Sequence, residues 1–251
     1  MKVVAILQAR VSSSRLPKKV LKPILGLPML QRQLERLSLC NTIDELILAT
    51  SDQTSDDELQ ALANSIGVKC FRGNLDDVLD RFYHAAKSSN AIHVVRLTGD
   101  CPLICPEVVD KVVAHHLDSG ADYTSNIAPP TYPDGLDVEV MTIGSLERAW
   151  TNAKLQSERE HVTPYIRKPE SSFYLENVEN DKDLSYLRWT VDEPRDFNFV
   201  LEIYSRLYLN NPHFTTQDIL SVIDNEPELL AINQNIERNE GYHLSLDKDK
   251  Y

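Results

Sequence analysis

Cationic side chains gather close to the amino terminus, where Arg10, Arg15, Lys18 and Lys19 follow the apolar residues 3–7. The apolar run is typical of a buried strand, so the basic loop would leave the carboxyl end of that strand, where parallel sheets bind their ligands. Like charges this close repel one another unless an anion lies among them. The segment therefore predicts a site for a nucleoside triphosphate.

The residues between these cations favour the same interpretation. Three consecutive serines, Ser12 to Ser14, offer hydroxyl groups and free backbone N–H groups, which a loop that holds phosphate needs. The loop is not a P-loop, because the pattern GxxxxGK[ST] is not present. A solvated charged surface is the alternative explanation for such a run of charges.

Two aspartates are expected at the same edge of the sheet as the basic loop. Asp100 comes shortly after the expected strand 91–97, and Asp192 directly follows the expected strand 187–191. Mg²⁺ prefers a couple of carboxylates together with phosphate oxygens and water, so the pair predicts a magnesium site. The alternative is that Asp100 caps its turn and that Asp192 caps the helix starting at Pro194.

Two further polar segments are candidates for substrate contacts. Arg72 and Gly73 follow another expected strand and would line the nucleotide from a second side, with a surface turn as the alternative. Glu158, Arg159 and His161 lie in a run of charged residues, and the histidine has the side chain best suited to proton transfer. We expect this run to contact the substrate, although a helical histidine also serves in packing.

The overall charge excludes one class of partner. The chain has 251 residues, with 26 Lys and Arg against 38 Asp and Glu, which gives a net charge of −12. An acidic chain is poorly suited to the phosphate backbone of nucleic acid, so we expect no such partner. No apolar stretch approaches the roughly 18 residues that cross a bilayer, and residues 3–7 are too few for a signal peptide. We therefore expect no membrane insertion and a cytoplasmic protein.

The cysteines predict no covalent framework. Cys40, Cys70, Cys101 and Cys105 are too few for a disulfide scaffold in a chain of this length, so we expect reduced thiols. Cys101 and Cys105 have the spacing CxxxC but no second Cys or His pair, which a structural zinc site usually needs. Small buried side chains are the favoured interpretation of these two, with a metal or redox pair as the alternative.

The elements that position these residues alternate between strands and helices in the first half of the chain, as in βα units on a parallel sheet. The second half adds a turn-rich loop, 128–135, between two strands, which is well placed to become a substrate lid. Expected strands cover 3–7, 45–50, 68–71, 91–97, 121–126, 136–143 and 187–191. Expected helices begin at Pro28, at the capping box Ser55-x-x-Glu58, at Asp76, at Pro106, at Ser145, at the capping box Ser157-x-x-Glu160 and at Pro194.

No repeat, low-complexity tract or long linker divides the chain. We therefore expect a single domain over residues 1–251, with a core of 1–210 and a polar helical tail of 211–251.

The basic loop and the two aspartate motifs resemble those of the cytidylyltransferases that activate acidic sugars, namely the acylneuraminate and 3-deoxy-manno-octulosonate enzymes. Residues 9–21 match the family loop ARxxSxRLPxKxL, and Gly99-Asp100 and Val191-Asp192-Glu193-Pro194 match two further motifs. The resemblance covers nearly the whole chain. It looks closest to the branch called spore coat polysaccharide biosynthesis protein F, through residues 76–81, 133–139, 158–165 and 238–242. Two departures are Cys101, where glutamate is common, and Lys18, where glycine is common.

The resemblance implies an α/β fold of the three-layer nucleotide-diphospho-sugar transferase type, which is Rossmann-like, with a mostly parallel sheet, a β insertion and a helical C-terminal tail. It implies that Arg10 and Lys19 hold a triphosphate and that Asp100 and Asp192 share Mg²⁺, and these four form the expected catalytic set. The expected nucleotide-binding residues are Leu7, Gln8, Ala9, Arg10, Ser14, Arg15, Lys19, Arg72 and Gly73. The expected substrate-binding residues are Tyr132, Asp134, Gly135, Glu139, Glu158, Arg159 and His161.

The reaction implied is the transfer of CMP from CTP to an acidic sugar with release of pyrophosphate, in surface polysaccharide biosynthesis. The expected partners are CTP, the sugar and a second copy of the chain in a homodimer. Two alternatives stay open. A glycosyltransferase would use the same sheet edge and metal carboxylates but consume a nucleotide sugar, and a non-catalytic partner in polysaccharide assembly would bind the triphosphate without turnover.

Overall fold

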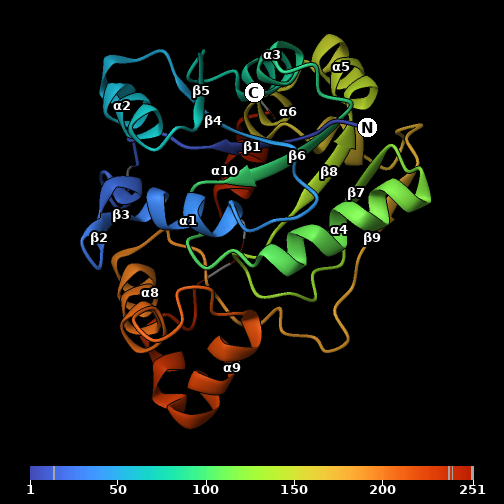
Figure 1. Cartoon of the computed structure of the whole chain (residues 1–251). Helices are drawn as coiled ribbons and strands as arrows, with labels where there is room; N and C mark the ends of the chain where they lie inside the picture. Colours follow the sequence, from blue (N-terminus) through green and yellow to red (C-terminus); the bar gives the residue numbers. More distant parts are fainter. Residues whose placement is uncertain (14, 237, 239, 250–251) are drawn as a thin grey trace.

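The structure is a computed structural model that describes residues 1–13, 15–236, 238 and 240–249. Within these residues, seven strands form one sheet in the order β5-β4-β1-β6-β8-β7-β9 (Figure 1). The strands are β1 (Val3–Gln8), β4 (Glu45–Ser51), β5 (Lys69–Gly73), β6 (His93–Thr98), β7 (Tyr123–Ser125), β8 (Glu139–Thr142) and β9 (Leu175–Asn177). The short strands β2 (Pro23–Ile24) and β3 (Leu27–Pro28) pair separately.

Helices cover both faces of this sheet (Figure 1). Helices α1 and α4 pack on one face, with α8 and α9 beyond them, and α3 and α5 pack on the other. The helices are α1 (Met29–Leu37), α2 (Asp57–Ser65), α3 (Val78–Ser88), α4 (Pro106–Ser119), α5 (Ile143–Asn152), α6 (Gln156–His161), α7 (Pro164–Arg167), α8 (Pro194–Leu207), α9 (Thr216–Asn225) and α10 (Glu240–Lys248). The 3-10 helices are η1 (Lys19–Leu21), η2 (Thr54–Asp56) and η3 (Pro227–Ile232).

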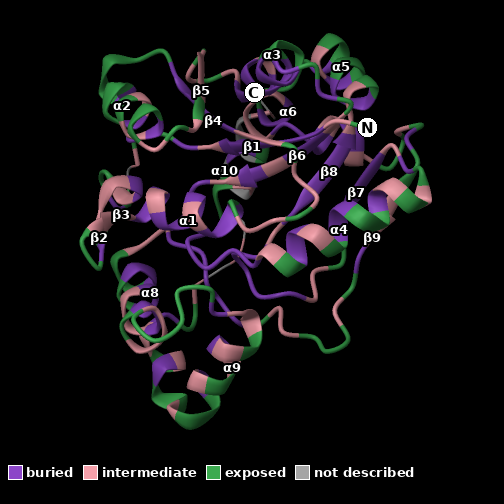
Figure 2. Ribbon diagram, in the orientation of Figure 1, coloured by how far each residue is buried: buried purple, intermediate pink, exposed green. Residues whose placement is uncertain are grey.

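Residues 3–7 of the central strand β1 are all apolar because both faces of the strand are covered. Val3, Ala5 and Leu7 belong to the core on the α1 and α4 side, whereas Val4 and Ile6 belong to the core on the α3 side. Successive side chains of a strand point to opposite faces, so a strand between two helical layers needs apolar residues at every position. Figure 2 shows this central part of the molecule as buried.

The order and direction of the strands decide where the loops meet. Strands β5, β4, β1 and β6 are parallel, with Gln8 of β1 opposite both Ala49 and Thr98. The loops after β1 and β6 therefore leave the same sheet edge side by side. Strand β8 is antiparallel to β6 and β7, and β7 pairs with β9 in parallel, so the β insertion extends the sheet on one side.

The expected α/β class with a mostly parallel sheet is confirmed. The expected strands at 3–7, 45–50, 68–71 and 91–97 correspond to β1, β4, β5 and β6. The expected strands at 121–126 and 136–143 are shorter in the structure, where β7 and β8 occupy only their centres. None of the helices among the described residues is both long and apolar enough to pass through a bilayer.

The expected strand at 187–191 is wrong. Only an isolated bridge between Asp134 and Arg188 forms there, although Trp189 and Val191 are fully buried. The Trp189 N–H donates to the Asp134 carbonyl at 2.6 Å, and the Val191 N–H donates to the Asp100 carbonyl at 2.8 Å. The apolar residues of this segment therefore pack in the core, but within the described structure the segment does not pair with a neighbouring strand beyond the single bridge.

Both expected capping boxes are also wrong. Helix α2 begins at Asp57 after the short helix η2, and its N-cap Asp56 uses its carboxylate to accept the Val11 N–H at 2.8 Å. Helix α6 begins at Gln156, one residue before the expected cap Ser157. A serine followed by a glutamate three residues later is a short signal. At α2 Asp56 takes the capping position, and at α6 Glu158 accepts the N–H groups of Lys154 and Leu155.

Candidate active site

A cavity of about 690 Å³ opens at the sheet edge where β1 and β6 end. Stretches far apart in the sequence line it, among them the basic loop after β1, the turn after β6, helix α3, the segment before and within β8, helices α6 and α7, the segment before α8 and the start of α10. The sequence-predicted residues that line it are Gln8, Ala9, Arg10, Arg15, Lys19, Asp100, Asp134, Glu139, His161 and Asp192. Ser14 lies outside the described residues.

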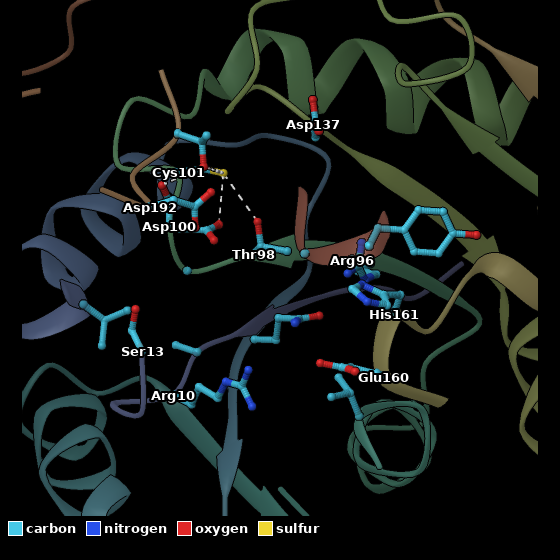
Figure 3. Close-up of a pocket in the computed structure, with 18 of the residues that line it drawn as sticks. Arg10, Ser13, Arg96, Thr98, Asp100, Cys101, Asp137, Glu160, His161 and Asp192 are labelled. Atoms are coloured by element: carbon cyan, nitrogen blue, oxygen red, sulfur yellow. Dashed lines mark hydrogen bonds between the residues drawn. The ribbon is translucent and has the colours of Figure 1, made fainter. Parts of the chain in front are cut away.

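Lys19 joins the basic loop to the two predicted metal ligands. Its Nζ donates to Asp192 Oδ1 at 2.9 Å, to Asp100 Oδ2 at 3.1 Å and to the Val191 carbonyl at 2.8 Å. Figure 3 shows Asp100 and Asp192 next to each other at one side of the cavity. The convergence expected from sequence is thus present, but Lys19 is no exposed loop lysine, because only 12% of its side chain is exposed.

The charges of this group support one another. Burial acts to lower the pKa of Lys19, but Asp100 and Asp192 outweigh it and hold the pKa above its ordinary value. Burial acts to raise the pKa of Asp100, but Lys19 and a hydrogen bond with Thr98 lower it to about 2. Both groups are therefore charged near neutral pH.

The alternative reading of Asp192 as a helix cap is wrong. The N-terminus of α8 is closed by Asp196, whose Oδ2 accepts the N–H groups of Asp192 and Glu193, each at 3.0 Å. The Asp192 side chain is free of that role and instead forms ion pairs with Lys19, with Arg15 at 3.1 Å and with Arg188 at 3.2 Å. Asp192 is thus a charge-bearing residue of the cavity.

Lys18 explains how the loop turns its neighbour inward. Its backbone is left-handed, with φ at 56°, a conformation that glycine adopts most easily, which agrees with the glycine that the family resemblance places here. The Lys18 side chain is 61% exposed and pairs with Glu58 at 2.7 Å. Lys18 therefore supplies a turn, whereas Lys19 supplies the charge in the cavity.

Arg81 is a cavity residue that sequence reasoning did not place in the site. It lies in α3, and its Nε is buried without a hydrogen-bond partner in the described structure. Burial and the neighbouring Arg10 guanidinium lower the pKa of Arg81 to about 10. Arg10 and Arg81 repel each other, and an anion bound between them would relieve this repulsion. This part of the cavity wall therefore attracts anions. The only sequence signal was a cation at helical spacing from the buried Val78.

A second charged cluster occupies the other side of the cavity, where Figure 3 shows Arg96 and His161. Glu139 is 2% exposed, pairs with Arg96 and lies 3.8 Å from Arg167. It also accepts the hydroxyl groups of Tyr123 and Thr163, each at 2.6 Å. Burial opposes ionisation, but the two arginines hold the pKa of Glu139 below its ordinary value.

We call this second group the distal cluster, which consists of Arg96, Glu139, Arg167 and His161. Burial and the nearby Arg96 lower the pKa of His161 to about 4, so its imidazole is neutral near pH 7. Sequence reasoning missed Arg96 and Arg167. Arg96 had a usable signal, because it is a charged residue within the otherwise apolar run of β6, and buried charges are paired or functional. Asp137 also lines the cavity, and burial raises its pKa to about 7.

Three predicted nucleotide contacts, Leu7, Arg72 and Gly73, are not among the described residues that line the cavity. Arg72 donates to Asp57 at 2.6 Å, to Gln60 at 2.9 Å and to two backbone carbonyls, so its guanidinium serves local structure. Gly73 lies against the Arg81 side chain. Leu7 is fully buried in the core beneath the cavity.

Four predicted substrate contacts are also outside that lining set, within the described part of the chain. Tyr132 is 4% exposed, packs in the core and accepts from Lys111 Nζ at 3.0 Å, so the loop 128–135 is no open lid there. Glu158 accepts the Lys154 N–H at 2.9 Å at the start of α6. Arg159 binds Asp77. Gly135 lets its backbone approach Trp189 and Thr190 closely.

The two carboxylates of the cavity are suited to a hard metal ion. Asp100 and Asp192 supply hard oxygen ligands, and Lys19 Nζ holds the cation position between them. No cluster of three or more His, Cys, Asp or Glu side chains suited to a metal is found in the residues the structure describes. Mg²⁺ is typically held by one or two carboxylates together with substrate phosphates, so this pair is sufficient for it.

A basic loop at the ends of parallel strands, facing paired carboxylates, is the site expected of a nucleotidyltransferase, and the sequence comparison assigns the chain to that class. The chain belongs to the family described as "Cytidylyltransferase", whose sequence model matches residues 4–229.

Proteins similar to this chain agree with that assignment. An uncharacterized protein, MJ1063 of Methanocaldococcus jannaschii, is 40% identical over 94% of this chain and 96% of its own length. The spore coat polysaccharide biosynthesis protein SpsF of Bacillus subtilis is 31% identical over 90% of this chain and 95% of its own length. The 3-deoxy-manno-octulosonate cytidylyltransferase of Chloroherpeton thalassium is 32% identical over 53% of this chain and 54% of its own length. The solved structure of a cytidylyltransferase from Leptospira borgpetersenii superposes with a TM-score of 0.89 and is 32% identical in sequence. The superposition covers 95% of this chain and 100% of that chain.

Proposed function

We propose that the protein transfers CMP from CTP to an acidic sugar and releases pyrophosphate, in the biosynthesis of a surface polysaccharide. The observation that carries the proposal is the contact of Lys19 with both Asp100 and Asp192 inside the cavity. The relatives named for spore coat polysaccharide and for 3-deoxy-manno-octulosonate support the kind of acceptor. The proposal includes a single domain with core 1–210 and tail 211–251, a homodimer and action in the cytoplasm.

The protein's own residues act by positioning and by neutralising charge. Arg10, Arg15 and Lys19 bind the triphosphate and stabilise the negative charge that develops on the departing pyrophosphate. Asp100 and Asp192 would hold Mg²⁺, which supplies further charge neutralisation at the phosphate oxygens when bound. Holding the acceptor hydroxyl close to the α-phosphorus accounts for much of the remaining rate, because phosphoryl chemistry needs little covalent help.

The end of β1 offers a buried hydrogen-bond acceptor to the base. Gln8 lines the cavity, and its Oε1 is buried with no hydrogen-bond partner in the described structure. A buried acceptor without a donor is costly, and the 4-amino group of cytosine is a donor that would satisfy it. Gln8 and Ala9 thus take the base, whereas the cations further along the loop take the phosphates.

The substrates are tested by assaying the purified protein with ATP, CTP, GTP and UTP, each combined with 3-deoxy-manno-octulosonate or N-acetylneuraminate. We expect pyrophosphate release with CTP and one of the acids, at a rate at least about tenfold above that of the other nucleotides. Consumption of a nucleotide sugar instead would support the glycosyltransferase alternative. A CTP-induced rise in melting temperature without any turnover would support a non-catalytic role.

Replacing Asp100 by asparagine tests the metal assignment. We expect turnover to fall by about 10²-fold or more and the response to added Mg²⁺ to disappear, because the amide carries no charge for the cation. Asp192→Asn should behave in the same way. Asp110→Asn is the control, because Asp110 binds the backbone of Asn41 and Thr42 outside the cavity. A magnesium response equal to that of the wild type would contradict the assignment.

A further inference from the structure

The C-terminal residues Arg238 and Glu240–Lys248 extend across the cavity, although they are the last part of the chain that the structure describes. Gly241 and Tyr242 line the cavity itself. The motif that contains them was one of the sequence features without an assigned task. Its position in the cavity wall brings it within reach of a bound substrate.

Several hydrogen bonds fix helix α10 on helix α6, next to the distal cluster. Ser245 Oγ lies 2.9 Å from His161 Nε2 and donates to Glu160 at 3.0 Å. The Ser157 N–H donates to Asp249 at 3.1 Å. Ser245 is buried, so these hydrogen bonds lie in the interior of the interface between the two helices. The helix is therefore a structural part of the cavity wall.

The segment also joins the two sides of the cavity. Glu240 pairs with Arg15 of the basic loop. Arg238 donates to Asp137 at 2.6 Å and lies 3.9 Å from Asp134. Two polar walls that come from distant parts of the sequence are thus held together by this short stretch.

The ring of Tyr242 is placed against the distal cluster. It makes an edge-to-face contact with the imidazole of His161, with ring centroids 5.1 Å apart. The Arg167 guanidinium lies 5.9 Å from the centre of the same ring. The cations of the basic loop belong to the opposite part of the cavity, as Figure 3 shows for Arg10 and His161. The tyrosine is therefore on the side that remains for the acceptor.

The chemistry of this side matches a sugar acid. Arg96 and Arg167 bring two positive charges to this side, where Glu139 and Glu160 balance them. The Nε of Arg96 is buried without a hydrogen-bond partner in the described residues, so it can donate to the carboxylate of a sugar acid. An aromatic ring offers an apolar surface to the C–H groups of a sugar ring, and Asp137 offers acceptors to its hydroxyl groups. Apolar surface with a few fixed polar groups is typical of a small-molecule site.

We propose that the C-terminal segment forms the acceptor-binding wall and that Tyr242 is a specificity-determining residue that contacts the ring of the sugar acid. The inference rests on the proposed function, because it concerns the second substrate of that reaction. It assigns Arg238 and Glu240 the positioning of this wall, through Asp137 and Arg15.

The test compares Tyr242→Ala and Tyr242→Phe with the wild type, using CTP and the sugar acid of the substrate panel that the wild type uses best. We expect Tyr242→Ala to raise the KM for the acid about tenfold, while the KM for CTP changes less than about twofold. Tyr242→Phe should stay close to the wild type, because the ring provides the contact. KM values do not depend on the fraction of active enzyme, so a partly folded variant still gives a valid result.

Leu246→Ala is the matched control, because Leu246 lies on the same helix and its side chain is partly exposed. It should change neither KM. Tyr242→Leu replaces Tyr242→Ala if the alanine variant gives no folded protein. Equal changes in the KM for CTP and for the acid, or an unchanged KM for the acid, would overturn the inference and leave the proposed function in place. Failure of the wild type to turn over any acid with CTP would remove both.

Discussion

Replacing Lys19 by alanine should lower kcat/KM by about a thousandfold and also lower the free energy of unfolding, by about 2 kcal/mol. The first effect follows from the loss of a cation among the phosphate-binding residues. The second follows because Asp100 and Asp192 would lose the ammonium group that lies between them. These carboxylates are 27% and 23% exposed, so water relieves part of the cost of leaving them uncompensated.

Steady-state kinetics and urea unfolding would measure the two effects separately. Lys18→Ala is the matched control: it removes the neighbouring lysine, whose side chain pairs with Glu58 at the surface. Added Mg²⁺ should restore part of the stability of Lys19→Ala, because a divalent cation bound by the two carboxylates would compensate the same charges. A variant with normal turnover would remove Lys19 from the mechanism, and one with normal stability would show that the aspartates do not depend on it.

Replacing Gly135 by alanine should destabilise the protein by about 4 kcal/mol and abolish most activity. Gly135 has φ at 108°, a conformation that side chains with Cβ rarely adopt. An added Cβ would lie 2.6 Å from the Thr190 nitrogen and 2.7 Å from the Trp189 carbonyl carbon. Both contacts are with backbone, so one of the two segments has to move.

The movement would reach the active site directly. Asp134 precedes the glycine and pairs with Arg188 at 2.9 Å, and Arg188 in turn binds Asp192 and the buried Asp196. Gly144→Ala is the control, because an added Cβ there meets only Thr142 Oγ1 at 3.9 Å and alanine favours the helix α5. Chemical denaturation and turnover of both variants test the prediction, and equal stability of Gly135→Ala and wild type would contradict it.

Much of the core fold was predictable because local patterns and burial agree there. Residues 3–7, which form most of β1, are apolar at every position, as a strand covered on both faces requires, and α4 begins at Pro106 as its sequence indicates. The error at 187–191 has a physical cause. Trp189 and Val191 are apolar because they are buried, and burial alone does not distinguish a ladder strand from an extended segment that packs in the core.

The candidate site was predictable only where residues leave the ends of parallel strands. Lys19 and Asp100 follow neighbouring strands, so topology brings them together. Tyr132 and Glu158 have side chains suited to a substrate, but core packing and helix capping use them. Residue type alone does not separate these roles, because a hydroxyl or a carboxylate serves structure and binding equally well.

The sequence by itself determined the α/β class, the basic loop and the two aspartates, because charge, apolar runs and strand ends are local properties of the chain. The tertiary structure alone decided that Lys19 lies between the carboxylates, that Arg96 and Arg167 surround Glu139, and that the C-terminal segment lines the cavity. These contacts join residues distant in sequence, and their geometry follows from the packing of whole elements against one another, which no local pattern encodes.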